Sequence, residues 1–310
     1  MQILIQIALL IIGFAMLVKG ADWFVEGVSG IAEKFGIPQL VIGLTIVAMG
    51  TSAPEAAVSI TAALKGNAGI TIGNVIGSNI LNILIILGIT AVIINVAVQK
   101  STLMCEIPYM IFITLILLAM GITGGSINFT EGVMLWILFI AYLTYLFLMA
   151  KKGKEEVKEE HKQKKVWKLL VFAVAGGVLV VWGSDVTVDS ATSIAMTFGL
   201  SERFIGLTIV ALGTSLPELF TSVTAAMKGK ADIAIGNIVG SNIFNILFVI
   251  GSTALITPVI FESNFLIDTL IAVTAGILLW ISVVKTRELR RPWGIIMLLS
   301  YAGYFVYLLV

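Results

Sequence analysis

The sequence predicts an all-α membrane protein with many spans, and three observations support this fold class. The chain of 310 residues is 59% hydrophobic and 12% charged, whereas soluble domains have about a quarter charged residues. Its mean hydropathy is +1.08. Its apolar runs reach the roughly 20 residues that one bilayer crossing requires. They are too long for barrel strands and do not alternate polar with apolar residues. We therefore expect helices, in which the backbone N–H and C=O groups are hydrogen-bonded within one segment.

Ten apolar segments are long enough to be transmembrane helices. The first lacks a basic start and a clear cleavage site and continues into Asp22 and Glu26, so we expect a helix and not a signal peptide. The predicted spans are 3–30, 38–64, 69–95, 102–121, 130–150, 167–195, 203–227, 232–257, 265–284 and 292–309.

Basic residues are distributed unequally between alternate loops. One set of loops contains only Lys65 and Arg203. Basic loops tend to stay in the cytoplasm. We therefore expect a multi-pass protein of the cell membrane with both termini extracellular and the polar linker 151–166 cytoplasmic. The basic set comprises Lys34, Lys100, the run 151–168, Lys228, Lys230 and the run 285–291.

An internal repeat divides the chain into two related halves. Residues 41–88 align with residues 204–251 at an offset of 163 without a gap, and 31 of the 48 positions are identical. Each half has five predicted spans, so the second half enters the bilayer from the opposite face. We expect residues 1–150 and 167–310 to form two inverted five-helix repeats. Many secondary transporters share this plan, with the binding site near the midplane on broken helices.

Each repeat contains a motif that is expected to break its helix. Residues 50–55 read GTSAPE and residues 213–218 read GTSLPE. Proline removes a backbone donor and clashes with the preceding turn, and glycine lowers helix propensity. Each span should therefore break here and leave carbonyls without helical partners. At membrane depth such backbone is tolerated only inside the protein or along a wet cavity.

Glu55 and Glu218 occupy the last position of the two motifs and are the strongest functional candidates. A charged residue in mid-span costs about 2.5–3.5 kcal/mol on insertion scales. No Lys or Arg lies within the core of either repeat: Lys65 and Lys228 are at span ends, from which their ammonium groups can reach the surface. The expected partner of the carboxylates is a bound cation. A proton is the alternative, because close like charges repel each other.

The second part of each repeat adds further oxygen ligands. Ser78 and Asn82 are four residues apart and share a helix face, as do Ser241 and Asn245, so we expect these four to contact the ion. The other asparagines either contribute ligands or bind helix backbones, and the sequence leaves both open: Asn74, Asn79, Asn237 and Asn242.

Hard oxygen donors of this kind suit Ca²⁺ and Na⁺, with Mg²⁺ and Mn²⁺ as further candidates. The repeats contain no cysteine and no histidine, and the single cysteine, Cys105, excludes a multi-cysteine metal cluster. The one histidine, His161, is in the linker. We expect no cofactor and no nucleic-acid partner. Acidic residues near one end of the first and sixth spans are either interfacial or an ion entry path, and Lys19 can pair with the first of them: Asp22, Glu26, Asp185 and Asp189.

The segments GTSAPE with GNVIGSNILN, and GTSLPE with GNIVGSNIFN, resemble the α-repeats of the cation/calcium antiporter superfamily, most closely the prokaryotic sodium/calcium exchangers. The resemblance covers essentially the whole chain. It implies a secondary active antiporter, not an enzyme, that exports cytoplasmic Ca²⁺ in exchange for Na⁺ by alternating access, with the first and sixth helices sliding against the rest. We expect it to function as a monomer.

The resemblance also implies a ligand set. Glu55 and Glu218 would be the central ligands, and Thr51 and Thr214 would supply backbone carbonyls. One departure matters: positions 82 and 245 are both asparagine, where some relatives carry an aspartate, which argues against the potassium-dependent branch. The remaining residues implied for the Na⁺ sites are Ser52, Ser215, Ser78, Ser241, Ala48 and Ala211.

Several alternatives remain open at this stage. A proton/calcium antiporter could use the same two carboxylates, although the repeats contain no histidine. The substrate could be another divalent cation. An intramembrane hydrolase could use two acids, but it has no reason to keep two copies of an oxygen-rich repeat. A channel would conduct a steady current in place of saturable exchange.

Overall fold

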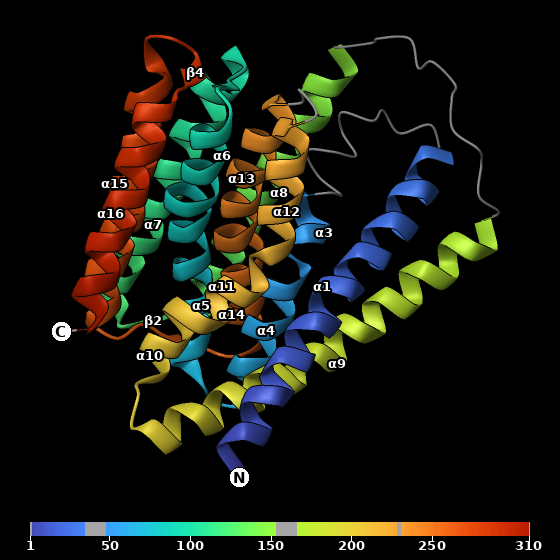
Figure 1. Cartoon of the computed structure of the whole chain (residues 1–310), viewed down its shortest axis with the longest axis vertical. Coiled ribbons are helices and arrows are strands. Elements are labelled where there is room, and N and C mark those ends of the chain that lie inside the picture. The colour runs from blue at the N-terminus through green and yellow to red at the C-terminus, as the bar shows by residue number, and fades with distance from the viewer. Residues whose placement is uncertain (1, 35–47, 153–165, 228–230, 310) are drawn as a thin grey trace.

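The described part of the chain is a bundle of helices. The computed structural model describes residues 2–34, 48–152, 166–227 and 231–309, and these residues are almost entirely helical (Figure 1). Large apolar side chains are exposed along the outer helices, for example Leu4, Phe147 and Trp182. Contiguous apolar surface of this kind is typical of contact with lipid. The predicted all-α membrane architecture is confirmed.

Within the described residues, eight helices are long and apolar enough to cross a membrane, or nine if the pair Glu202–Thr214 and Leu216–Met227, bent by 43°, is one span. The predicted span 38–64 begins outside the described residues, and its described part contains only α3 (Ala48–Thr51) and α4 (Ala53–Leu64). The count of ten spans is therefore not confirmed. The long α-helices without a break are α1 (Gln2–Lys34), α7 (Ile107–Gly124), α8 (Phe129–Lys152), α9 (Val166–Phe198), α15 (Asn264–Val284) and α16 (Arg291–Leu309).

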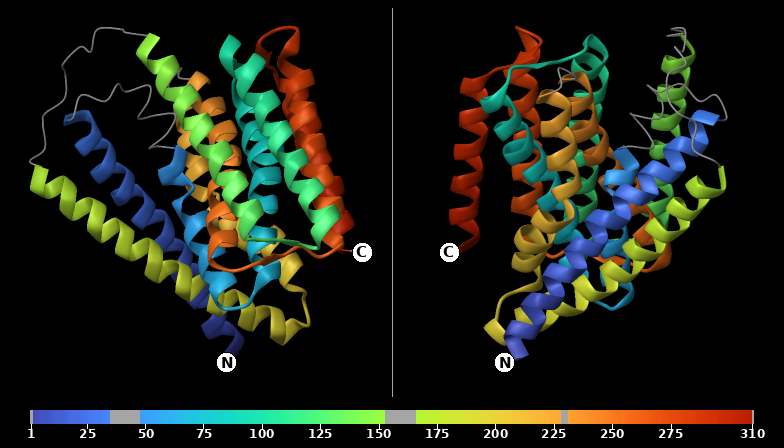
Figure 2. Two further views of the ribbon diagram at one scale, coloured as in Figure 1. Left: turned by 180° about the vertical axis from the view of Figure 1, so that it is seen from behind. Right: turned by 45° about the vertical axis from the view of Figure 1, so that its right-hand side comes forward.

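The helices α1 and α9 form an oblique pair beside the bundle (Figures 1 and 2). Each has 33 residues and is about 50 Å long at 1.5 Å per residue, so each exceeds the roughly 30 Å hydrocarbon core. Glycines allow their backbones to touch: a Cβ atom on Gly20 would lie 2.9 Å from the carbonyl oxygen of Gly176. Any larger side chain at these positions would separate the pair.

The repeat is visible in the boundaries of the helices. Besides α3, which recurs as α11 (Ala211–Thr214), four helical elements of the first half recur in the second half, and every boundary is shifted by 163 residues. Similar local sequence thus produces the same local structure, including one π-helical segment in each half, a feature that is frequent at functional sites. The matched pairs are α4 with α12 (Leu216–Met227), α5 (Ala68–Leu81) with α13 (Ala231–Phe244), η2 (Asn82–Leu87) with η5 (Asn245–Ile250), and α6 (Gly88–Ile93) with α14 (Gly251–Ile256).

The inverted orientation of the halves stays a prediction, as do the boundaries at residues 150 and 166. Residues 153–165, with His161, lie outside the described residues. So do residues 41–47 at the start of the first repeat. The second broken helix is described throughout: it comprises α10 (Glu202–Ile205), η4 (Gly206–Val210), α11 (Ala211–Thr214) and α12.

Two short antiparallel pairings connect loops of the two halves at opposite ends of the bundle (Figure 1). The strand β1 (Val96–Ala97) pairs with β4 (Glu288–Leu289), and β2 (Ser126–Ile127) pairs with β3 (Val259–Ile260). The register places Val96 opposite Leu289 and Ser126 opposite Ile260. Two further π-helical segments are η4, in the second broken helix, and η3 (Thr102–Glu106), which precedes α7.

The buried apolar residues form two separate clusters. The larger one fills the space between the two helices that contain η2 and η5 and the helices α7, α8 and α15. Its members include Ile83, Ile113 and Leu247. The smaller one lies where α1 and α9 meet α4, with Leu17 and Val188 fully buried. The pair α1–α9 is thus packed on the bundle through its own small core.

Candidate cation-binding site

Two helix breaks lie at the centre of the bundle. Ser52, between α3 and α4, has φ −87° and ψ 7°, and Ser215, between α11 and α12, has φ −82° and ψ 4°. Pro54 and Pro217 follow the breaks, and their missing N–H groups cannot continue the helical ladder. The breaks predicted from the two proline motifs are confirmed.

The carboxylates that follow the breaks are fully buried. Glu55 and Glu218 lie in the first turns of α4 and α12 and are both 0% exposed, and a negative charge is favourable at this end of a helix. Ser52 Oγ donates to Glu218 Oε1 at 2.7 Å, and Ser215 Oγ donates to Glu55 Oε1 at 2.9 Å. The carboxylates also interact electrostatically with each other. Each break therefore supplies a hydroxyl to the carboxylate of the other half.

The threonines of the two motifs also form hydrogen bonds to residues of the other half. Thr51 Oγ1 donates to Asn237 Oδ1 at 3.3 Å, and Thr214 Oγ1 donates to Asn74 Oδ1 at 3.0 Å. Asn74 Nδ2 in turn donates to the backbone oxygen of Glu55 at 3.2 Å. The question left open by the sequence is answered for Asn74: its amide binds a helix backbone, and it also holds the threonine of the other half.

Six buried side-chain oxygens in this region have no hydrogen-bond partner within the described residues. A buried polar group without a partner costs about 1–3 kcal/mol, so the set requires a ligand. Carboxylate, hydroxyl and amide oxygens are the donors that hard cations prefer, and this donor set fits Ca²⁺ or Na⁺ as the transported ion. The oxygens come in equivalent pairs from the two halves: Glu55 Oε2 and Glu218 Oε2, Ser78 Oγ and Ser241 Oγ, Asn82 Oδ1 and Asn245 Oδ1.

The backbone ligands implied by the family resemblance have partners in this structure. The oxygen of Ala48 accepts from the N–H of Ser52 at 3.1 Å, and that of Ala211 accepts from the N–H of Ser215 at 3.0 Å. Each oxygen also accepts from a threonine hydroxyl, that of Ala48 from Thr51 Oγ1 at 3.1 Å and that of Ala211 from Thr214 Oγ1 at 3.3 Å, so both lone pairs of each carbonyl have partners. The roles of Ala48, Ala211 and the threonine carbonyls stay predictions.

One of the oblique helices reaches the site directly. A Cβ atom on Gly213, the first residue of the second motif, would overlap the ring of Phe14 in α1. Only glycine allows this approach. The helix α1 is therefore in direct contact with the segment that carries Ser215 and Glu218.

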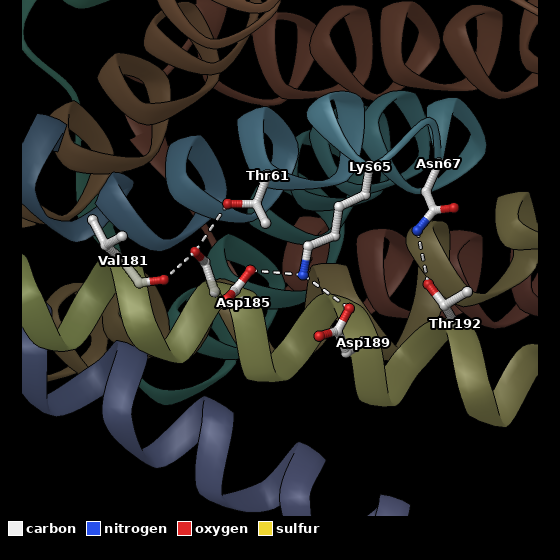
Figure 3. Close-up of polar contacts among 8 residues, drawn as sticks. Thr61, Lys65, Asn67, Val181, Asp185, Asp189 and Thr192 are labelled. Atoms are coloured by element: carbon white, nitrogen blue, oxygen red, sulfur yellow. Dashed lines mark hydrogen bonds and ion pairs between the residues drawn. The ribbon is translucent and has the colours of Figure 1, made fainter.

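A row of polar contacts connects α9 to the end of α4 and the start of α5 (Figure 3). Lys65 Nζ lies 2.6 Å from Asp185 Oδ1 and 2.8 Å from Asp189 Oδ1, and Asn67 Nδ2 donates to Thr192 Oγ1 at 2.9 Å. Although desolvation lowers the pKa of Lys65, the two carboxylates hold that pKa above its ordinary value.

The position of Lys65 at the end of its span agrees with the prediction. Its two aspartate partners were not predicted, and they are within reach because α9 crosses the end of α4. The predicted pairing of Lys19 with Asp22 is confirmed, at 3.8 Å and on the surface.

A buried ion pair near the second broken helix was missed by the sequence analysis. Arg203, one residue into α10, binds Asp268 of α15 with both Nε and Nη2, at 2.7 and 2.9 Å. Tyr304 of α16 donates to Asp268 Oδ1 at 3.1 Å. An isolated acid within an apolar span is itself a signal that a partner exists, and Asp268 in the span 265–284 carries that signal.

The fold and site together define a multi-pass membrane transporter of hard cations. Outer helices present apolar surface, and the only concentration of unpartnered oxygens within the described residues lies at paired helix breaks in the interior. Those residues contain no group of three or more His, Cys, Asp and Glu side chains that could hold a metal ion, so the two glutamates act together with hydroxyl and amide oxygens. The donors are a carboxylate, a hydroxyl and an amide from each half.

Comparison with known proteins identifies the family. The model of the sodium/calcium exchanger protein family matches residues 5–148 and 168–310, so the chain belongs to this family of antiporters and not to an enzyme family. The CaxA protein of Alkalimonas amylolytica is 39% identical over 97% of this chain and 98% of its own length. The sodium/calcium exchanger MaX1 of Methanosarcina acetivorans is 31% identical over 99% of both chains.

A solved structure supports the same assignment. The sodium-calcium exchanger NCX_Mj, in crystals soaked with Na⁺ and Sr²⁺, superimposes with a TM-score of 0.71 at 33% identity and covers 98% of this chain and 99% of its own. The family resemblance noted from the two repeats is thereby confirmed.

Proposed function

We propose that the protein exchanges Na⁺ for Ca²⁺ at one central site and exports Ca²⁺ from the cytoplasm. The observation that carries the proposal is the set of six unpartnered oxygens contributed equally by the two halves. Ca²⁺ accepts six to eight oxygens in flexible geometry, and the two buried glutamates supply two negative charges that one Ca²⁺ balances. Na⁺ binds the same kind of oxygen, so the two ions compete for the site.

Competition at a shared site is the physical basis of exchange. In the proposed cycle the site opens to one side at a time, and the oblique pair α1–α9 changes its position on the bundle between the two states. The separate core beneath this pair and the contact of Phe14 with Gly213 support such a movement. The carboxylates cannot remain unpaired in the interior without cost, which favours movement of the loaded carrier over the empty one.

We also propose a location, an orientation and an oligomeric state for the protein. The protein acts as a monomer in the cell membrane, with both termini extracellular and the linker 151–166 on the cytoplasmic side. The contrast in basic residues between alternate loops supports this orientation.

Radioactive Ca²⁺ uptake into proteoliposomes tests the coupling. Vesicles loaded with Na⁺ are diluted into Na⁺-free buffer with labelled Ca²⁺, and a second set receives a pH jump with no Na⁺ gradient. We expect uptake that requires the outward Na⁺ gradient and continues in the presence of a proton ionophore. Uptake driven only by the pH jump would identify the proton/calcium antiporter, which the adjacent buried glutamates could also support.

Two controls complete the assay. Vesicles that contain Glu55→Gln protein measure leakage, and competition by unlabelled Mg²⁺ and Mn²⁺ measures selectivity. No uptake in either arm, together with transport of another divalent cation, would overturn Ca²⁺ as the substrate.

A further inference from the structure

Four asparagines lie at the junctions where the two central helices change from α- to π-helical geometry. All four are buried, and none of their side chains reaches the lipid-facing surface. Two precede the junctions and two begin the π-helical segments. They are Asn79 in α5, Asn82 in η2, Asn242 in α13 and Asn245 in η5.

The first pair is anchored to backbone carbonyls across the interface between the halves. Asn79 Nδ2 donates to the backbone oxygen of Asn242 at 3.3 Å, and Asn242 Nδ2 donates to the backbone oxygen of Asn79 at 3.1 Å. A carbonyl oxygen can only accept a hydrogen bond. Each amide must therefore present its nitrogen to the opposite backbone, and this requirement fixes which way the amide is turned, a choice that is otherwise ambiguous.

The fixed orientation of the first pair determines that of the second. Because the nitrogens of Asn79 and Asn242 face backbone, their Oδ1 atoms are left as acceptors. Asn82 Nδ2 donates to Asn242 Oδ1 at 2.9 Å, and Asn245 Nδ2 donates to Asn79 Oδ1 at 3.1 Å. The Oδ1 atoms of Asn82 and Asn245 then point away from these partners, and both are buried and unpartnered.

We infer that Asn79 and Asn242 are positioning residues for the cation site: each turns the ligand amide of the other half so that it presents oxygen, and not NH₂, to the ion. The inference rests on the proposed function. Without the acceptor on Asn242, Asn82 can rotate by half a turn and direct its partly positive NH₂ group at the cation. Loss of the acceptor on Asn79 would allow Asn245 to rotate in the same way.

Ca²⁺ binding to the purified full-length protein, measured by isothermal titration calorimetry, gives the readout. Asn242→Ala removes the acceptor for Asn82 but leaves the backbone oxygen of residue 242, so Asn79 and Asn245 keep their orientation. We expect the dissociation constant for Ca²⁺ to rise about tenfold, the effect of one hydrogen bond to an ionic site. Asn79→Ala should produce a similar loss through Asn245.

Partner-specific rescue separates positioning from packing. An aspartate at residue 82 offers oxygen on both faces, so its orientation no longer matters. In the Asn82→Asp protein, the further change Asn242→Ala should not weaken Ca²⁺ binding. The acceptor that it removes, Asn242 Oδ1, then faces a carboxylate oxygen and has no amide to orient. Asn245→Asp adds the same charge but is not the partner of Asn242, so Asn242→Ala should still weaken binding about tenfold in that protein.

The reciprocal arm uses Asn79→Ala, which Asn245→Asp should rescue and Asn82→Asp should not. Equal losses in both aspartate backgrounds would show that the asparagines only pack, and equal rescue by both would show only added charge; either result overturns the inference. Failure of the unmodified protein to bind Ca²⁺ would instead overturn the proposed function. Elution as a single peak in size-exclusion chromatography checks folding, and if one alanine variant fails this check, the other arm supplies the test.

Discussion

The hydroxyl of Ser52 donates a 2.7 Å hydrogen bond to Oε1 of Glu218, a residue 166 positions further along the chain. The equivalent serine of the second half, Ser215, binds Oε1 of Glu55. In both cases the second carboxylate oxygen, Oε2, has no protein partner within the described residues. The serines thus hold each carboxylate by one oxygen and leave the other for the ion.

Removing either serine should weaken ion binding to a similar extent. A hydrogen bond to a charged group contributes about 1.5–3 kcal/mol, so Ser52→Ala and Ser215→Ala should each raise the Ca²⁺ dissociation constant at least about tenfold. Calorimetry on purified protein measures this. Ser282→Ala is the matched control, because Ser282 is equally buried but donates only to the backbone of Leu279. Loss of affinity in the control variant, or in only one of the two serine variants, would contradict the reciprocal arrangement.

Neutralising either central carboxylate should abolish transport. Glu55→Gln or Glu218→Gln removes half of the charge that balances Ca²⁺, and we expect Na⁺-driven Ca²⁺ uptake to fall at least about a hundredfold, or roughly 2.7 kcal/mol. The control is Glu106→Gln. Glu106 is also a buried glutamate, but it accepts from Thr102 in η3, away from the helix breaks. Wild-type uptake in a folded Glu55→Gln protein would refute the site.

The contacts of Lys65 with α9 should contribute to stability. Its side chain is 31% exposed, so the expected effect is modest: Lys65→Glu should destabilise by about 1 kcal/mol, near the upper end for exposed pairs. Asp189→Lys in the same protein should restore part of the loss. Thermal unfolding in detergent measures both changes. Lys19→Glu, at a more exposed pair with an N–O distance of 3.8 Å, should have a smaller effect.

The free energy of unfolding should depend much more strongly on the buried pair of Arg203 and Asp268. Asp268 is 0% exposed and Arg203 is 18% exposed, and removal of one partner of a buried pair costs about 3–5 kcal/mol. Arg203→Gln leaves a buried carboxylate whose one remaining donor among the described residues is Tyr304, so it should be more harmful than Asp268→Asn, which can still accept from Arg203. The apparent free energy of unfolding in a denaturant titration checks this order, and the double variant should lose less than the sum.

The proposed orientation can be checked by labelling single cysteines in a Cys105→Ser protein. Lys100 and Glu262 are both exposed, one close to β1 and the other close to β3 at the opposite end of the bundle (Figure 1). In intact cells a membrane-impermeant thiol reagent should label Glu262→Cys and not Lys100→Cys. The reverse pattern would place both termini in the cytoplasm. Permeabilised cells, in which both should react, are the control.

The parts of the structure that follow from local sequence were predicted correctly. The long apolar helices and the two breaks are encoded in continuous runs and short motifs, and the equivalence of the repeats in an alignment without gaps. The proline and glycine effects that produce the breaks act over one turn. The glutamates could be selected because a buried acid without a basic neighbour requires a partner.

Features that depend on contacts between distant segments could not be predicted in this way. Nothing near Ser52 in the sequence indicates Glu218 as its partner, and nothing near Lys65 indicates α9. Asn79 and Asn242 could be recognised as buried amides, but their orientation depends on the packing of one half against the other. The π-helical segments at Asn82 and Asn245 are a further case, since an apolar run fits α- and π-helical geometry equally well.

The crossed hydrogen bonds between the halves have a consequence for how such a chain could have arisen. Each half contains a complete copy of the motif, yet its carboxylate, its threonine and its ligand amide are all held by residues of the other copy. A half-length chain with this motif would therefore need a second copy of itself to organise the same site. In the present chain the two copies differ at equivalent positions such as Leu81 and Phe244.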